Sequence, residues 1–374
     1  MSRRNIMIIK YLILLSLLSG CGTDGIQQAS IENYGLVGIV GYDLETSDNN
    51  QYKVTVALPQ SHPEAEELTQ VFTVIDKEPY EAMLEIARKT EKALDFSQLR
   101  VILFSEDLVR EKGILGIMER LYRDPNIGAN VYIGVTKGPP EEVIKGDYKD
   151  KPQIILYLHD LMEPHLEATF RPFTTIHDFI YEATDRTSDP KVPYLEKIEG
   201  TIDISHVALF ENDKMVDLLK PDEGKYMQAM ARAKRLPSIG FNIQEKSGDE
   251  PYVALDLINS RSKIKSNGDL ENPMVNIRLK LDGMAMSYTG EQNLEEANSR
   301  KIVEDAIGKR VEEECLKLIK KLQELKVDPV RFSESFRSRV SGDWSEDEWR
   351  NVIYPKVTFE VEATIEITST GILE

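Results

Sequence analysis

The side chains closest to a metal-binding constellation are His159, Glu163 and His165, because imidazole and carboxylate groups are common ligands of zinc. In a helix, His159 and Glu163 would share one face at the i, i+4 spacing. Pro164 breaks that geometry before His165, and a zinc site needs three or four ligands in a set arrangement. We therefore expect no metal site.

Nucleophilic and phosphate-binding motifs are not indicated either. Ser105 is followed by Glu106 but lacks the flanking glycines of the G-x-S-x-G turn that presents a catalytic serine. Gly35, Gly38 and Gly41 are spaced along an expected strand, whereas a phosphate-binding loop has its glycines at a strand-to-helix turn. The residues imply no cofactor.

Paired carboxylates and the second thiol have structural explanations. Glu360, Glu362 and Glu366 would share the outward face of the last strand, where charge discourages the pairing of further strands. Cys315 lies within an apolar helical stripe, which favours inert packing. With no catalytic constellation, we expect a binding or scaffolding protein rather than an enzyme.

The first cysteine, Cys21, ends a different kind of segment. Arg3, Arg4 and Lys10 precede or interrupt an apolar run, as in the leader of an exported protein. The run at 11–18 is shorter than the roughly 20 residues that a membrane-spanning helix needs. We expect residues 1–20 to be a signal peptide that is removed.

The sequence Leu18-Ser19-Gly20-Cys21 resembles the lipobox of bacterial lipoproteins. The resemblance implies cleavage after Gly20 and attachment of a diacylglyceryl group to the Cys21 thiol. Two acyl chains, at about 0.8 kcal/mol per buried methylene, anchor a protein stably to a bilayer. An ordinary secretory signal with an incidental cysteine is the alternative.

Charge and cysteine content exclude further classes. Removal of residues 1–20, which hold three basic and no acidic residues, changes the net charge from −18 to −21. Nucleic acid would repel such a chain, so we expect no nucleic-acid partner. With Cys21 committed to lipid, Cys315 has no partner for an intrachain disulfide, and the fold must rest on its apolar core.

The hydrophobic pattern predicts three domains after a short polar tether. Alternation and apolar runs predict strands at 36–40, 52–58, 99–104, 131–135, 207–210 and 215–219, with helices at 79–94, 106–122 (broken at Gly113), 154–161 and 174–183. The expected divisions are a tether at 21–32, an N-terminal α/β domain at 33–140, a middle domain at 141–225 and a C-terminal domain at 226–374.

The C-terminal domain is expected to be an antiparallel sheet covered by one long helix. Alternating residues predict strands at 253–257, 277–281 and 357–367. The intervening helix has an apolar stripe that would cover the sheet or, alternatively, bind a partner helix: Val303, Ile307, Val311, Cys315, Leu318, Leu322 and Leu325. Trp344 and Trp349 either anchor an interface or hold this part of the chain against the final sheet, and we expect the latter.

Three segments in order resemble the Ger(x)C family, the lipoprotein C subunits of spore germinant receptors. They are 98–108 (QLRVILFSEDL), 208–216 (ALFENDKMV) and a C-terminal series of QELKVDP at 323–329, Phe336-Arg337, Trp344, Trp349, Pro355-Lys356-Val357, Ile367 and Thr370-Gly371. Gly41-Tyr42-Asp43 also matches. Asp217 and Phe332-Ser333 depart from the pattern, in which glycine is common at these places, and both departures lie in turns or at strand edges.

The resemblance implies an α+β fold of three domains, each a mixed or antiparallel sheet flanked by helices. It also implies a lipid-anchored, non-catalytic subunit on the outer face of the spore inner membrane. Its partners would be the membrane-embedded A and B subunits, and the complex would respond to nutrient germinants. Whether this subunit contacts the germinant is open. The alternative is a solute-binding lipoprotein of an ABC transporter, although such proteins have two similar lobes and the last third of this chain does not repeat the first.

Overall fold

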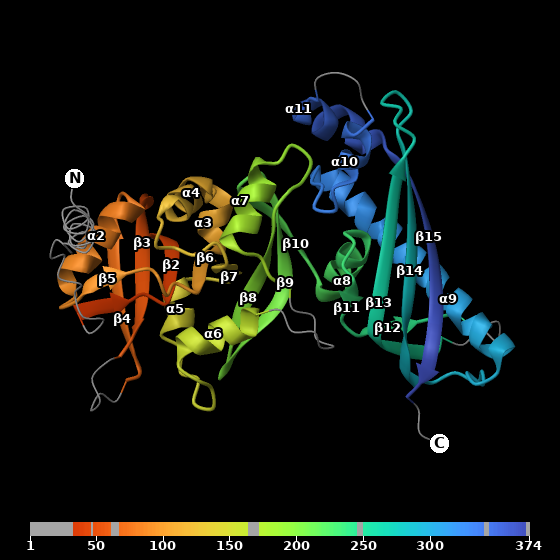
Figure 1. Ribbon diagram of the computed structural model, residues 1–374, viewed down its shortest axis with the longest axis horizontal. Coiled ribbons are helices and arrows are strands. Elements are labelled where there is room, and N and C mark those ends of the chain that lie inside the picture. Colours follow the sequence, from red (N-terminus) through yellow and green to blue (C-terminus); the bar gives the residue numbers. More distant parts are fainter. Residues whose placement is uncertain are drawn as a thin grey trace, which may run out of the picture.

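The computed structural model describes residues 33–45, 48–60, 67–163, 172–244, 250–339 and 344–371. Cys21, the predicted signal peptide at 1–20, the predicted tether at 21–32 and His165 lie outside the described residues. The described residues form two sheet units that lie side by side along the long axis of the molecule (Figure 1). A small parallel pair, β1 (Tyr34–Leu36) and β5 (Ala93–Asp95), accompanies the first unit.

The first unit is an eight-stranded mixed sheet. Its four central strands β2, β6, β7 and β8 are parallel, and antiparallel strands complete both edges. In spatial order the strands are β10 (Lys214–Leu219), β9 (Thr201–Glu211), β8 (Lys191–Ile198), β7 (Tyr132–Thr136), β6 (Val101–Ser105), β2 (Ile39–Glu45), β3 (Asp48–Pro59) and β4 (Thr69–Asp76).

Helices cover both faces of this sheet, which explains why β6 is apolar at successive positions. Ile102 and Phe104 pack in one apolar cluster, while Val101 and Leu103 pack in another on the opposite face. The first face is covered by α2 (Pro79–Lys89), α3 (Glu106–Glu111), α4 (Leu115–Arg123) and α7 (Ile176–Thr184), and the second by α5 (Pro140–Ile144) and α6 (Ile154–Met162).

Glycines in and before β2 let the second helix layer approach closely. A Cβ atom added to Gly38 would lie 2.5 Å from Ile155 of α6, and one added to Gly41 would lie 2.7 Å from Pro140 of α5. These glycines therefore serve helix–sheet packing. Gly113, in contrast, separates α3 from α4 with a φ of +77°, and the expected helix break is confirmed.

The strand pairing does not follow the expected division at residue 140. β7 lies before that position and β8 after it, yet the two strands pair in parallel in one sheet. The segment 141–225 therefore shares its sheet with 33–140 instead of having its own. The hydrophobic period reports which residues form strands but not which strands become neighbours. The division at 225/226 falls inside α8 (Pro221–Met230).

The second unit is a five-stranded sheet with one long helix across it. It comprises β11 (Arg235–Leu236), β12 (Ile239–Asn242), β13 (Tyr252–Ser266), β14 (Met274–Tyr288) and β15 (Thr358–Thr370). Helix α9 (Ala297–Leu325) lies over one face (Figure 1). Its stripe from Val303 to Leu322 is buried against the strands, so the sheet-covering interpretation is confirmed.

The expectation that this sheet is antiparallel is wrong for its last pair. β15 runs parallel to β14, because α9 crosses between the two strands and returns the chain to the same end of the sheet. Short elements between α9 and β15 complete the unit: α10 (Phe332–Arg337), α11 (Glu346–Glu348), a π-helical turn at Trp349–Ile353 and a 3₁₀ turn at Tyr354–Lys356. In the described residues, no helix is both long and apolar enough to cross a membrane.

Close packing of α9 on β15 generates a stability prediction. A Cβ atom added to Gly308 would lie 2.8 Å from the backbone oxygen of Ala363. We expect Gly308→Ala to lower the free energy of unfolding by about 1–3 kcal/mol, despite the better helix propensity of alanine. The matched control is Gly116→Ala in α4, where an added Cβ meets no atom within 4 Å and stability should stay or rise. Urea unfolding measures both, and equal effects would contradict the assigned contact.

Candidate functional site

Two of the three side chains considered as metal ligands, His159 and Glu163, lie close together in the described residues. His159 lies in α6, and its ring lies within 4.8 Å of carboxylate oxygens from Asp160 and Glu163, both of which are exposed. Its Nδ1 atom is 3.2 Å from Asp160 Oδ1. Exposed acidic groups are common without a metal ion, so this cluster by itself does not indicate a metal site.

The glutamates of the last strand and the second cysteine have the structural settings expected of them. Glu360, Glu362 and Glu366 are exposed on the edge strand β15. Glu362 accepts from Arg278 at 3.0 Å. Cys315 is fully buried, and burial raises the pKa of its thiol, so it is not poised to react.

The two tryptophans belong to a packed contact between the two sheet units. Trp349 is 3% exposed and stacks on Tyr354 at 5.5 Å between ring centroids. The ring centroids of Trp344 and Trp349 are 5.5 Å apart, and the indole nitrogen of Trp344 donates to the carbonyl oxygen of Arg186 at 3.0 Å. Trp349 thus packs in the C-terminal core as expected, while Trp344 reaches the loop before β8, a contact that the sequence did not indicate.

A buried ion pair lies at the centre of this contact. The Arg350 guanidinium donates to both carboxylate oxygens of Asp189, at 2.8 and 3.1 Å, and the two side chains are 10% and 4% exposed. Asp189 also accepts from the backbone N–H of Asp328 at 2.6 Å. Arg350 also donates to the carbonyl oxygen of Lys326 at the end of α9 and to the carboxylate of Glu346. Such a bidentate, desolvated pair defines both distance and orientation.

A second buried carboxylate, Asp328, organises the turn after α9. Its two oxygens accept from the backbone N–H groups of Phe332 and Ser333 at 2.9 and 2.8 Å. Burial raises the pKa of Asp328 to about 6. Ser333 is fully buried and donates to the carbonyl oxygen of Thr187 at 2.8 Å, so the position that departs from the family pattern forms a contact between the units.

The sequence did not single out Asp189, Asp328 and Arg350 as a buried cluster. Since 29% of the residues are charged, their types alone do not distinguish them from the many charged residues on the surface. The one local signal is at Asp328, which stands between the fully or largely buried Val327 and Val330. A charge within an apolar stretch indicates a paired, buried group. No such signal surrounds Asp189.

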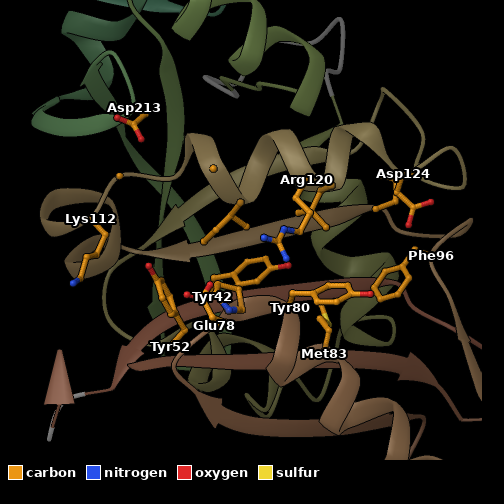
Figure 2. A pocket seen from close by; sticks show the side chains of 16 residues that line it. Tyr42, Tyr52, Glu78, Tyr80, Met83, Phe96, Lys112, Arg120, Asp124 and Asp213 are labelled. Carbon is orange, nitrogen blue, oxygen red and sulfur yellow. The ribbon is translucent and has the colours of Figure 1, made fainter. Parts of the chain in front are cut away.

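A separate cavity lies in the first unit between α2, α4 and the strands β2 and β3. It measures ≈ 380 Å³, and Tyr42, Tyr52, Tyr80 and Phe96 contribute aromatic rings to it. Figure 2 shows the Arg120 side chain reaching from α4 toward Tyr42 and Tyr80. The guanidinium carbon lies 5.2 Å from the centre of the Tyr80 ring. Sequence reasoning did not identify this cavity, since its walls come from segments up to 171 residues apart (Tyr42 and Asp213).

The buried ion pair predicts a large loss of stability when one partner is removed. We expect Arg350→Met to lower the free energy of unfolding by about 3–5 kcal/mol, because Asp189 would stay buried without its cation. The control is Arg278→Met, which removes an exposed pair with Glu362 and should cost less than about 1 kcal/mol. If urea unfolding gave similar losses in the free energy of unfolding for the two variants, the Asp189–Arg350 pair would stabilise the fold no more than an exposed pair does.

The raised pKa of Asp328 predicts a pH dependence of stability. Between about pH 4 and pH 6, Asp328 is largely protonated in the folded chain, whereas an unfolded aspartate, with a pKa of about 3.9, has released its proton. The contribution of this group to the free energy of unfolding should therefore fall, by up to about 3 kcal/mol, as the pH rises from about 4 to about 6. Asp328→Asn should lack this part of the dependence. Urea unfolding at a series of pH values measures this. If the difference in the free energy of unfolding between the two proteins is the same at every pH in this range, the assignment is contradicted.

Comparison with known proteins identifies the family. Residues 27–197 match the family described as spore germination protein N-terminal domain, and residues 205–371 match the family described as spore germination B3/GerAC like, C-terminal. Spore germination protein GerQC of Bacillus cereus is 27% identical over 366 residues, covering 98% of this chain and 99% of that relative. Spore germination protein B3 of Bacillus subtilis (strain 168) is 22% identical, covering 97% of each chain.

The fold agrees with that of a solved structure. The crystal structure of the GerBC protein superimposes with a TM-score of 0.57 at 20% identity, covering 88% of this chain and 97% of that chain. This likeness confirms a mixed α/β architecture of several sheets flanked by helices. Together with the two consecutive family matches, it confirms the predicted resemblance: the chain belongs to the GerC-type family of spore germination proteins.

Proposed function

We propose that this spore germination protein is a lipid-anchored, non-catalytic subunit of a nutrient germinant receptor that acts with membrane-embedded A and B subunits. The observation that carries the proposal is the pair of consecutive family matches, which together extend from residue 27 to residue 371. The names of the relatives describe spore germination proteins, and a receptor subunit is the specific role we infer for this chain.

The described side chains support a role in binding or scaffolding. Cys315 is inaccessible, and the buried charges Asp189, Asp328 and Arg350 are engaged with one another or with backbone groups. Polar groups that are engaged in contacts between the units or within the turn after α9 are not available for acid–base catalysis.

The lipobox-like sequence supports the proposed anchor on the outer face of the cell membrane, the spore inner membrane. Residues 22–32 separate the proposed lipid-carrying cysteine, Cys21, from the first described residue, Asn33. At no more than about 3.6 Å per residue, this tether would keep the folded part within roughly 45 Å of the bilayer. That distance brings the folded part within reach of membrane-embedded subunits.

A solute-binding lipoprotein of an ABC transporter is less well supported. Two similar lobes with a ligand cleft between them would be expected, whereas this chain has an eight-stranded and a five-stranded sheet. The two units also share one apolar cluster, in which Val207 and Leu219 of the first unit join Val253 and Val303 of the second. A continuous core does not suit a cleft that opens and closes.

Anchoring is tested by fractionation. We expect Cys21→Ala to move the protein from the membrane fraction to the soluble fraction, because the acyl chains would be lost. Cys315→Ala is the control and should leave the protein with the membrane. Retention of the Cys21→Ala protein in the membrane would argue against lipid attachment.

The receptor role is tested in spores of the host. Deletion of the gene, in a strain that lacks paralogous receptors, should abolish the response to at least one nutrient germinant, and reintroduction of the gene should restore it. An unchanged response to every nutrient germinant would overturn the proposal. If the response is lost and restored as expected, crosslinking in spore membranes would identify the subunits that contact the chain.

A further inference from the structure

We propose that the cavity between α2, α4, β2 and β3 binds a small monocarboxylate with an apolar body. The proposal rests on this cavity alone and does not depend on the receptor role. It names a binding site in the first sheet unit, on the face covered by α2 and α4 (Figure 2).

The size and walls of the cavity suit a small organic molecule. Its volume of ≈ 380 Å³ falls within the range of about 300–1,000 Å³ that is usual for ligand pockets. A dry cavity of about 150 Å³ holds a benzene ring, so this one has room for a ring or branched chain and a polar group. The apolar part would lie against Tyr42, Tyr52, Tyr80 and Met83.

Arg120 supplies a cation that is suited to a carboxylate, whereas the ammonium of Lys112, which also lines the cavity, donates to Asn50 at 3.4 Å. Within the described part of the chain, the Arg120 guanidinium forms no ion pair. It lies over the Tyr80 ring, and its charge also acts on the buried Tyr42 hydroxyl, where it partly offsets the rise in pKa that burial causes. The neighbouring Arg123 differs, because it pairs with Glu119 one turn earlier at 3.0 Å. The residue one turn before Arg120 is Gly116, which offers no side chain. A planar guanidinium left free beside aromatic rings matches the geometry of a carboxylate.

The acidic residues near Arg120 limit the charge of the ligand. Asp124 lies one turn after Arg120, but its Oδ1 atom accepts from the backbone and side chain of Asn126. Glu78 also lines the cavity, and its negative charge contributes, after burial, to the raised pKa of Tyr52. A second negative charge on the ligand would be repelled by Glu78, which favours a monocarboxylate over a dicarboxylate.

The wall formed by α4 is held in place and is open at Gly116. Asp213, in the turn between β9 and β10, accepts from the backbone N–H of Leu115 at 3.1 Å through its side chain and from Ile114 at 3.2 Å through its carbonyl. Gly116 lines the cavity, and an added Cβ would meet no atom within 4 Å. A larger side chain at 116 therefore has room to fill the cavity without straining the fold.

Isothermal titration calorimetry on the full chain in lipid nanodiscs tests the proposal. The probes are phenylacetate, 4-methylpentanoate, benzyl alcohol, 2-phenylethylamine and the dianion benzylmalonate. We expect at least one of the two monocarboxylates to bind about tenfold or more tightly than the alcohol, the amine and the dianion. No binding of either monocarboxylate, or equal binding of the alcohol, would overturn the proposal.

Three variants locate the binding. Arg120→Gln should weaken monocarboxylate binding about tenfold or more and leave the alcohol unaffected. Arg123→Gln, on the same helix but outside the cavity, is the matched control and should bind as the unchanged chain does. Gly116→Leu should abolish binding of every probe while the melting temperature stays or rises, since leucine favours the helix. Equal affinities of the Arg120 and Arg123 variants, or undiminished binding to the Gly116 variant, would refute the site.

Discussion

The ion pair between Asp189 and Arg350 is the interaction on which the arrangement of the two sheet units depends. Each charge would be costly to bury alone, and the low dielectric that makes isolation costly also strengthens their attraction. Apolar burial around Val207, Leu209 and Leu219 drives the two units together, but it has no preferred direction. The bidentate pair supplies that direction, because its two hydrogen bonds at 2.8 and 3.1 Å form only in one relative placement.

The hairpin of β9 and β10 connects this contact with the aromatic cavity. Its strands contribute Val207, Leu209 and Leu219 to the core shared by both units. Its turn contributes Asp213, which holds the start of α4 and hence the wall that carries Arg120. One supersecondary element thus contributes to the interface through its strands and to the cavity through its turn. The resemblance of 208–216 to the family pattern falls on this hairpin.

Much of the secondary structure was predictable from local pattern. The helix break at Gly113, the buried stripe of α9 and the exposed glutamates of β15 follow from backbone freedom and periodicity, which act within a few residues. The pairing of β7 with β8 and the parallel course of β15 were not predictable in the same way. Many residues separate the paired strands, and alternation assigns a residue to a face without naming the neighbouring strand.

By itself, the sequence determined the family, the acidic character of the chain and the prediction of a lipid anchor at Cys21, because each is encoded in contiguous or ordered residue types. Only the tertiary structure decided which of the many charges are buried together and where a cavity remains. Asp189 and Arg350 are 161 positions apart, and Arg120 differs from Arg123 only in what the fold places beside it. Charge and apolarity are properties of single residues, whereas pairing and enclosure belong to their arrangement in space.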